Sequence, residues 1–157
     1  IIFTLGYTLK GVYGKVIATA SHSSLGVAEL ETTFTTDNIS EETLKKVENI
    51  KILEVYEDGH IRASAPRYRA FRKVVEGIVF AGGIFLDIEG NQEIMLTMIT
   101  STDNECLHDL EDVAFSMPIL TQPSISRFAL KSSVQELHLV VQDLASCKLT
   151  IEHIYDY

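Results

Sequence analysis

The stretch IKILEVYEDGHIRASAPRYRAFRKVVEGIVFAGGIFLDI, residues 50–88, holds the signals that decide the fold. Asp58-Gly59 separates two short strand-like runs and supplies the backbone geometry of a tight hairpin. From residue 67 to 81 apolar residues recur at helical spacing, and Gly82-Gly83 ends that segment. With a final run over residues 84–88, the stretch predicts strand, strand, helix and strand.

The residues before this stretch add a strand and a short helix. Polar and apolar side chains alternate over residues 27–34, as a half-buried strand requires. Ser40 followed by Glu41 and Glu42 predicts a helix start, because a hydroxyl can cap backbone N–H groups and carboxylates suit the positive end of the helix dipole. The order becomes strand, helix, strand, strand, helix, strand.

The second half of the chain predicts the same order. Glu89-Gly90-Asn91-Gln92 indicates a hairpin into a strand over 93–100, and Thr102-x-x-Glu105 is a capping box for a helix that runs to Met117. The remaining elements are two short strands around Pro123-Ser124, a helix opened by Ser133-x-x-Glu136, and a last strand over residues 148–156.

This repeated order predicts an α+β fold of two consecutive ferredoxin-like βαββαβ units. We place the units at residues 26–90 and 91–157, with additional N-terminal β-strands in residues 1–25 that pack on the body. Right-handed crossovers would put both helices of a unit on one face of an antiparallel sheet. The opposite face of each sheet would stay free for binding or pairing.

The composition is that of a folded chain with excess negative charge. Hydrophobic residues make up 46%, charged residues 22%, and the formal net charge is −9. Because nucleic acids and anionic membranes are bound through basic surfaces, this charge argues against both as partners. No apolar run reaches the about 20 residues that span a bilayer, so we expect a cytoplasmic protein. The chain begins with Ile1, which predicts a processed or trimmed start.

The two cysteines, Cys106 and Cys147, are expected to be packing residues with free thiols in a reducing cytosol. A single bridge between them is the alternative. Their spacing from the histidines matches no zinc motif, and no phosphate-cradling loop or nucleophile elbow is present. We therefore expect no metal and no cofactor.

A basic cluster is the first candidate for a binding site. No acidic residue interrupts it, and the start of the predicted helix could add its dipole to the binding of a phosphate or carboxylate. A solvated helix face is the alternative interpretation. The cluster consists of Arg62, Arg67, Arg69, Arg72 and Lys73.

An acidic run in the second half could complement that cluster within one molecule or across a homodimer. A solvated acidic face explains it equally well. The run contains Asp103, Glu105, Asp109, Glu111 and Asp112.

Two stretches resemble regulatory proteins. DLASCKLTIEHIYDY, residues 143–157, resembles the end of the first helix and the second strand of ACT-type domains. Residues 71–121 are similar to the regulatory segment of bacterio-opsin-activator-type transcription regulators, with Ala81-Gly82-Gly83 ending a helix and Met117-Pro118-Ile119 following another. Both resemblances imply a sensor module that binds a small ligand or a second copy of itself.

We therefore expect a non-catalytic regulatory or sensor module that binds a small anionic ligand or a protein partner. RNA binding is disfavoured, because the expected third strands lack the stacked aromatic pattern of RNA-recognition domains. The alternative is a small metabolic enzyme whose site is assembled across the sheet, since His and Asp side chains can meet in a fold without any local motif.

Overall fold

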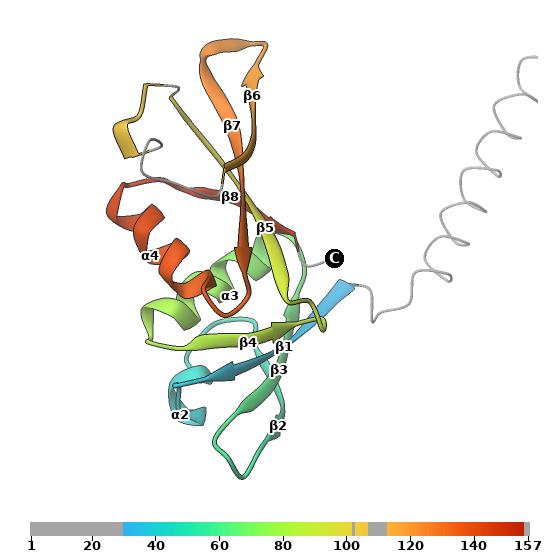
Figure 1. The fold of residues 1–157 in the computed structure, drawn as a ribbon. Coiled ribbons are helices and arrows are strands. Elements are labelled where there is room, and N and C mark those ends of the chain that lie inside the picture. The colour runs from blue at the N-terminus through green and yellow to red at the C-terminus, as the bar shows by residue number, and fades with distance from the viewer. Residues whose placement is uncertain (1–29, 102, 107–112, 156–157) are drawn as a thin grey trace, which may run out of the picture. The chain divides into compact units, whose positions relative to one another are not determined.

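The computed structural model describes residues 30–101, 103–106 and 113–155. They belong almost entirely to one compact unit, Thr32–Tyr157. The N-terminal strands expected in residues 1–25 lie outside the described residues. The described part is an α+β fold with two four-stranded antiparallel sheets (Figure 1).

The first sheet has the strand order β2-β3-β1-β4. Its strands fall within the predicted unit 26–90. The elements are β1 (Glu31–Asp37), α2 (Glu41–Leu44), β2 (Lys51–Val55), β3 (Ile61–Pro66), α3 (Arg69–Phe80) and β4 (Ile84–Ile88).

The second sheet has the order β6-β7-β5-β8. In both sheets the strand that comes first in sequence thus lies between the third and the fourth. The elements are β5 (Glu93–Ser101), β6 (Val113–Ile119), β7 (Gln122–Ser133), α4 (Leu137–Ser146) and β8 (Ile151–Tyr155).

Local signals in the first half act as predicted. The Ser40 hydroxyl accepts a hydrogen bond from the Thr43 N–H at 3.2 Å and caps α2. Gly59 takes φ +92° between β2 and β3, and Gly82 takes φ +90° after α3, so both adopt the left-handed backbone that glycine tolerates best. The hairpin and the helix end are confirmed.

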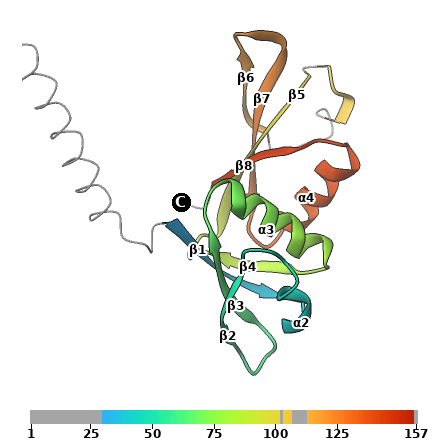
Figure 2. The same cartoon turned by 180° about the vertical axis from the view of Figure 1, so that it is seen from behind.

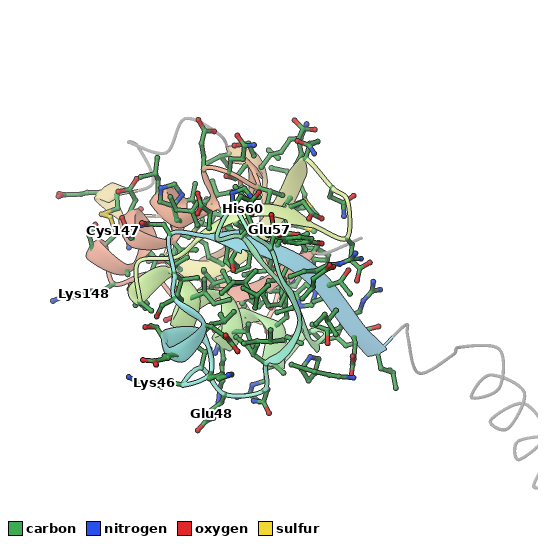
Figure 3. All side chains as sticks on the ribbon, turned by 90° about the horizontal axis from the view of Figure 1, so that it is seen from below. Lys46, Glu48, Glu57, His60, Cys147 and Lys148 are labelled. Atoms are coloured by element: carbon green, nitrogen blue, oxygen red, sulfur yellow. A yellow bond between two sulfur atoms is a disulfide. The ribbon has the colours of Figure 1, made fainter. Side chains whose placement is uncertain are left out.

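The core lies between the sheets and the two longer helices. α3 contacts β3 of the first sheet and β8 of the second, and α4 contacts β4 and β7 (Figure 2). Side chains from both sheets and both helices form one buried cluster (Figure 3). In that cluster the Phe34 ring centroid lies 6.0 Å from Phe71 and 5.5 Å from Phe85. The predicted apolar stripes of α3 and α4 therefore face the core.

Two predictions about the second half are wrong. The helix predicted from Thr102 to Met117 is wrong over its last five residues, because they belong to the edge strand β6 (Val113–Ile119); its middle part, residues 107–112, lies outside the described residues. Antiparallel pairing with β7 overrides the local helical pattern there. Pro123 and Ser124 lie inside β7 and do not form a turn between strands.

The predicted hairpin at residues 89–92 is also wrong. β4 pairs with β1, whereas β5 pairs with β7 and β8, so the two strands belong to different sheets. Glu89 at φ +52° and Gly90 at φ +76° form a turn that leads the chain from one sheet to the other. The turn signal was correct, but it did not determine which strands pair.

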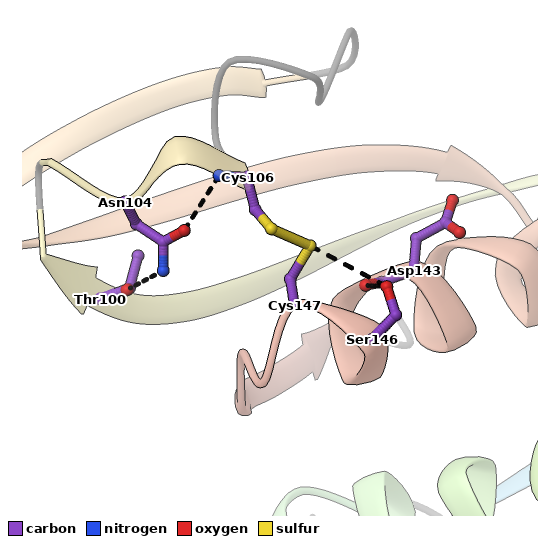
Figure 4. The surroundings of a disulfide bond; sticks show 6 residues. All are labelled: Thr100, Asn104, Cys106, Asp143, Ser146 and Cys147. Carbon is purple, nitrogen blue, oxygen red and sulfur yellow. Dashed lines mark hydrogen bonds between the residues drawn. A yellow bond between two sulfur atoms is a disulfide. The ribbon is translucent and has the colours of Figure 1, made fainter.

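The free-thiol prediction for Cys106 and Cys147 is wrong as well, because the two form a disulfide (Figure 4). Their Cα atoms lie 6.1 Å apart, although 41 positions separate them in sequence. The bond joins a short 3₁₀ turn after β5 to the C-terminal end of α4. Asn104 fixes the turn by accepting the Cys106 N–H at 3.0 Å. The cytoplasmic location stays a prediction; no helix among the described residues is long and apolar enough to cross a membrane.

Candidate functional site

The five residues of the predicted basic cluster lie in different surroundings in the structure. Arg62 lies on the uncovered face of the first sheet and lines a hollow of about 580 Å³ together with Asp87 and Glu89. Arg67 lies 3.7 Å from the same Glu89 carboxylate. These two arginines therefore face acidic side chains that come from other elements.

The other three basic residues lie on α3. Arg72 donates from Nη1 to the Ile151 carbonyl oxygen at 2.6 Å and lies 3.8 Å from Glu76, so it ties α3 to β8. Arg69 and Lys73 are exposed, one turn apart. The cluster as an anion site stays a prediction, and no ion pair with a described acidic residue involves Arg69 or Lys73.

A second hollow, on the uncovered face of the second sheet, offers a more developed arrangement. Cross-strand register places Ala129 of β7 and His153 of β8 on either side of Thr97 of β5. Phe115 of β6 lies opposite Ala129. Thr97 is small and buried, and it lines the hollow between larger side chains. The hollow has a volume of about 550 Å³ and is lined by Tyr68, Thr97, Phe115, Met117, Arg127, Glu152, His153 and Tyr155.

A β-bulge brings two polar residues of β8 to this hollow. Thr97 pairs with His153, but the next residue, Met98, pairs with Ile151, so Glu152 is an extra residue in β8. A bulge interrupts the strict alternation of side chains, and Glu152 and His153 both line the hollow. In a regular strand, consecutive side chains point to opposite faces.

Arg127 and Glu152 form a two-pronged ion pair across β5. Nε and Nη2 of the guanidinium donate to the two carboxylate oxygens at 2.6 and 2.7 Å. These hydrogen bonds hold the pKa of Glu152 below its ordinary value and raise the pKa of Arg127 above its own. The Thr97 hydroxyl, which lines the same hollow, is buried and has no hydrogen-bond partner among the described residues. Both charges are therefore fixed in place at neutral pH.

Within the described part of the chain only Glu152 accepts hydrogen bonds from Arg127, and it takes two of the five N–H donors, which leaves three. Glu152 fixes the orientation of the guanidinium, so an anionic group could bind without first ordering the side chain. The chemistry of the hollow is thus an oriented hydrogen-bond donor beside a carboxylate.

Aromatic and apolar side chains form the walls. The His153 ring lies 6.2 Å from the Tyr68 ring in a stacked arrangement and 4.4 Å from the Tyr155 ring, edge to face. On the other side, Phe115 is 44% and Met117 is 53% exposed. Exposed apolar groups around a polar centre are typical of ligand sites.

Local sequence signals did not identify this site. Arg127 follows a stretch, Val113–Ser126, that has no charged residue, and a charged residue within a strand was the available signal. The bulge at Glu152 and the pairing across β5 depend on contacts between distant residues. Among the described residues, no group of three or more His, Cys, Asp or Glu side chains could hold a metal ion.

No protein-family model, curated protein or solved structure matches this chain. The resemblances to ACT-type domains and to bacterio-opsin-activator-type regulators therefore stay predictions.

Proposed function

We propose that the protein is a non-catalytic regulatory or sensor module that binds a small organic ligand in the hollow over Thr97. The oriented guanidinium of Arg127 carries this proposal. The ligand would place an anionic group on Arg127 and an apolar or flat part between Phe115 and the ring of Tyr155. A volume of about 550 Å³ lies in the range of small-molecule sites.

Electrostatics favour a ligand with a single local anionic group. The net charge of −9 repels anions at long range, so binding needs a specific anchor. Arg127 supplies that anchor, and Glu152 limits the positive potential around it. A highly charged polyanion would gain little here, because the ion pair is neutral as a whole.

We also infer that each sheet forms a ferredoxin-like unit with the helices that connect its strands, of which α4 is the one described in the second half. The shared strand order, in which the first strand lies between the third and the fourth, supports this, since βαββαβ units have that order. In such units the helices cover one sheet face. The proposed ligand site lies on the face that they leave open.

A thermal-shift screen of small organic acids, amino acids, nucleotides and phosphorylated metabolites tests the ligand proposal. A ligand at one hundred times its dissociation constant stabilises the folded state by about 2.7 kcal/mol. We expect Arg127→Gln to abolish the shift caused by a hit. Lys131→Gln is the matched control, because Lys131 lies in the same strand and forms an exposed pair with Glu93 at 2.6 Å.

Another outcome of the same screen would place the binding site elsewhere. If the shift survives Arg127→Gln but is lost in the double variant Arg69→Ala and Lys73→Ala, the predicted basic cluster is the binding site and the proposal is wrong. The melting temperature of each variant without ligand shows whether a lost shift reflects binding or unfolding.

Catalysis is the second candidate, because His153 lies beside Glu152 in the same hollow. A histidine next to a carboxylate can transfer protons. Hits from the screen would be incubated with the protein and their conversion followed by NMR. A catalytic role predicts conversion that is lost in His153→Gln while the thermal shift is kept; unchanged hits support the binding module.

A further inference from the structure

Tyr68, which lines the hollow over Thr97, has a backbone conformation that its residue type disfavours. Its φ of +66° and ψ of −130° lie in a region that glycine adopts far more readily than any residue with a bulky side chain. It also precedes the first residue of α3, and its side chain makes no capping hydrogen bond to that helix. A glycine would suit the backbone better, and a serine or aspartate would cap the helix. Local stability therefore does not explain a tyrosine at this position.

Contacts on both sides of Tyr68 hold this strained conformation. On one side, Arg67 Nη2 lies 3.7 Å from Glu89 Oε1. On the other, the Arg72 N–H donates to the Tyr68 carbonyl oxygen at 3.4 Å, and the Arg72 guanidinium donates to the Ile151 carbonyl oxygen at 2.6 Å. The first turn of α3 is thereby fixed to β8. Strained residues that are held by neighbouring contacts in this way cluster at ligand sites.

The Tyr68 ring is presented to the hollow and not to the core. Tyr68 is 52% exposed, so burial does not account for its size. Its ring lies nearly parallel to the His153 ring, at an interplanar angle of 27°. Phe115 and Tyr155 add further rings to the lining of the same hollow. Aromatic rings stack on other flat rings or meet them edge to face, and both arrangements stabilise a contact beyond what the buried area alone provides.

We propose that the ligand is an aromatic carboxylate and that Tyr68 is the residue that selects its flat ring. This inference rests on the proposed function, in which Arg127 anchors the anionic group. Among the described residues, Glu152 alone accepts from Arg127, through Nε and Nη2, which leaves N–H groups on Nη1 and Nη2. One N–H from each of these nitrogens can point the same way, which matches the two oxygens of a carboxylate. Because rings line the rest of the hollow, a flat skeleton fits it better than a saturated one.

The strain at Tyr68 can be tested without a ligand. Tyr68→Gly and Tyr68→Ala both remove the ring, but only alanine keeps a side chain that disfavours the positive φ. We therefore expect the glycine variant to unfold at the higher urea concentration, although glycine ordinarily destabilises relative to alanine through its freedom in the unfolded chain. An alanine variant at least as stable as the glycine variant would show that Tyr68 is not strained and would overturn the inference.

Titration calorimetry with a matched pair of acids tests the ring selection. Naphthoate and its fully saturated analogue have the same carbon skeleton and charge, but only naphthoate is flat. We expect wild-type protein to bind naphthoate at least about threefold more tightly, as the added stability of an aromatic pair predicts. Tyr68→Leu should lose this preference and Tyr68→Phe should keep it. Tyr56→Leu is the matched control, because Tyr56 does not line this hollow and should leave the preference unchanged.

The outcomes separate this inference from the proposed function. Equal affinities for the two acids, or a preference that survives Tyr68→Leu, would overturn the ring selection; if binding is still lost in Arg127→Gln, the anchor and the proposed site stand. No binding of naphthoate would overturn the aromatic class, and the broad thermal-shift screen would still decide whether another ligand binds through Arg127. Naphthoate that binds Arg127→Gln as tightly as wild type would overturn both the inference and the anchor.

Discussion

The disulfide between Cys106 and Cys147 should contribute a large share of the stability. The two residues are 41 positions apart, and the bond closes that stretch into a loop. With the chain-entropy relation for a loop of this length, the bond lowers the entropy of the unfolded chain by an amount worth about 4 kcal/mol. Small domains have a total free energy of unfolding of about 5 to 15 kcal/mol. Reduction should therefore remove at least about a quarter, and at most the larger part, of the free energy of unfolding.

Urea unfolding with and without a dithiol reductant measures this contribution. The reductant donates two electrons, breaks the S–S bond and leaves two thiols. We expect the midpoint to fall on reduction, and a thiol assay in urea to find no free thiol before reduction and two per chain after it. The double variant Cys106→Ala and Cys147→Ala should unfold near the reduced midpoint and not respond to reductant.

The reasoning fails if oxidised and reduced protein unfold at the same midpoint. Free thiols in the purified, unreduced protein would contradict the bond itself and would favour the two packing residues expected from the sequence. A midpoint change in the double cysteine variant on adding reductant would show that the reductant acts elsewhere.

Three further predictions concern local features. Ser40→Ala should lower the free energy of unfolding by about 1 kcal/mol, because α2 loses its cap; an unchanged urea midpoint would contradict the capping role. Gly59→Ala should lower the free energy of unfolding by about 1 kcal/mol through backbone strain at φ +92°. An added Cβ would meet no atom within 4 Å, so no steric clash contributes. A stabilised variant would show that the turn relaxes. Arg127 lowers the pKa of Glu152, so their pair stabilises fully above the unfolded carboxyl pKa of about 4.3 and is lost as pH falls through the lower folded value. Wild type should therefore lose stability relative to Glu152→Gln only in that acidic range. The difference should be less than about 1 kcal/mol, because the pair is partly exposed. An equal loss of stability in both proteins would argue against a stabilising ion pair.

Local signals predicted the first sheet well. The alternation in β1, the turn at Asp58-Gly59 and the apolar stripe of α3 each lie within a few residues of one another in sequence. Such signals are strong because the backbone period and the turn geometry are local properties. They therefore determined which elements form, and the antiparallel α+β class followed from their order.

The second half exposed the limit of local patterns. Val113 and Met117 fit the end of a helical stripe, yet both lie in strand β6, because pairing with β7 satisfies the backbone groups there. The turn at Glu89-Gly90 was detected, but the partner of β5 lies in β7 and β8. Strand pairing depends on contacts between residues far apart in sequence, so local patterns in a single sequence do not predict which strands pair.

The candidate site illustrates the same limit for function. The basic cluster was chosen because no acid interrupts it in sequence, but folding places Glu89 beside Arg67 and Glu76 beside Arg72. Arg127 had no charged neighbour in sequence that could draw attention to it, although its partner Glu152 lies only 2.6 Å away in the structure.

A charged residue that follows a long uncharged stretch within a strand is therefore the more informative signal in this chain. Its side chain must find a partner across the sheet or face an open surface, because burial of an unpaired charge is costly. Arg127 does both: Glu152 accepts from two N–H donors of its guanidinium, and the side chain lines an open hollow. The charge of an isolated arginine would be satisfied by water alone, whereas this one is oriented before any ligand arrives. That orientation is why we propose the hollow over Thr97 as the binding site and keep the exposed residues of α3 as the alternative.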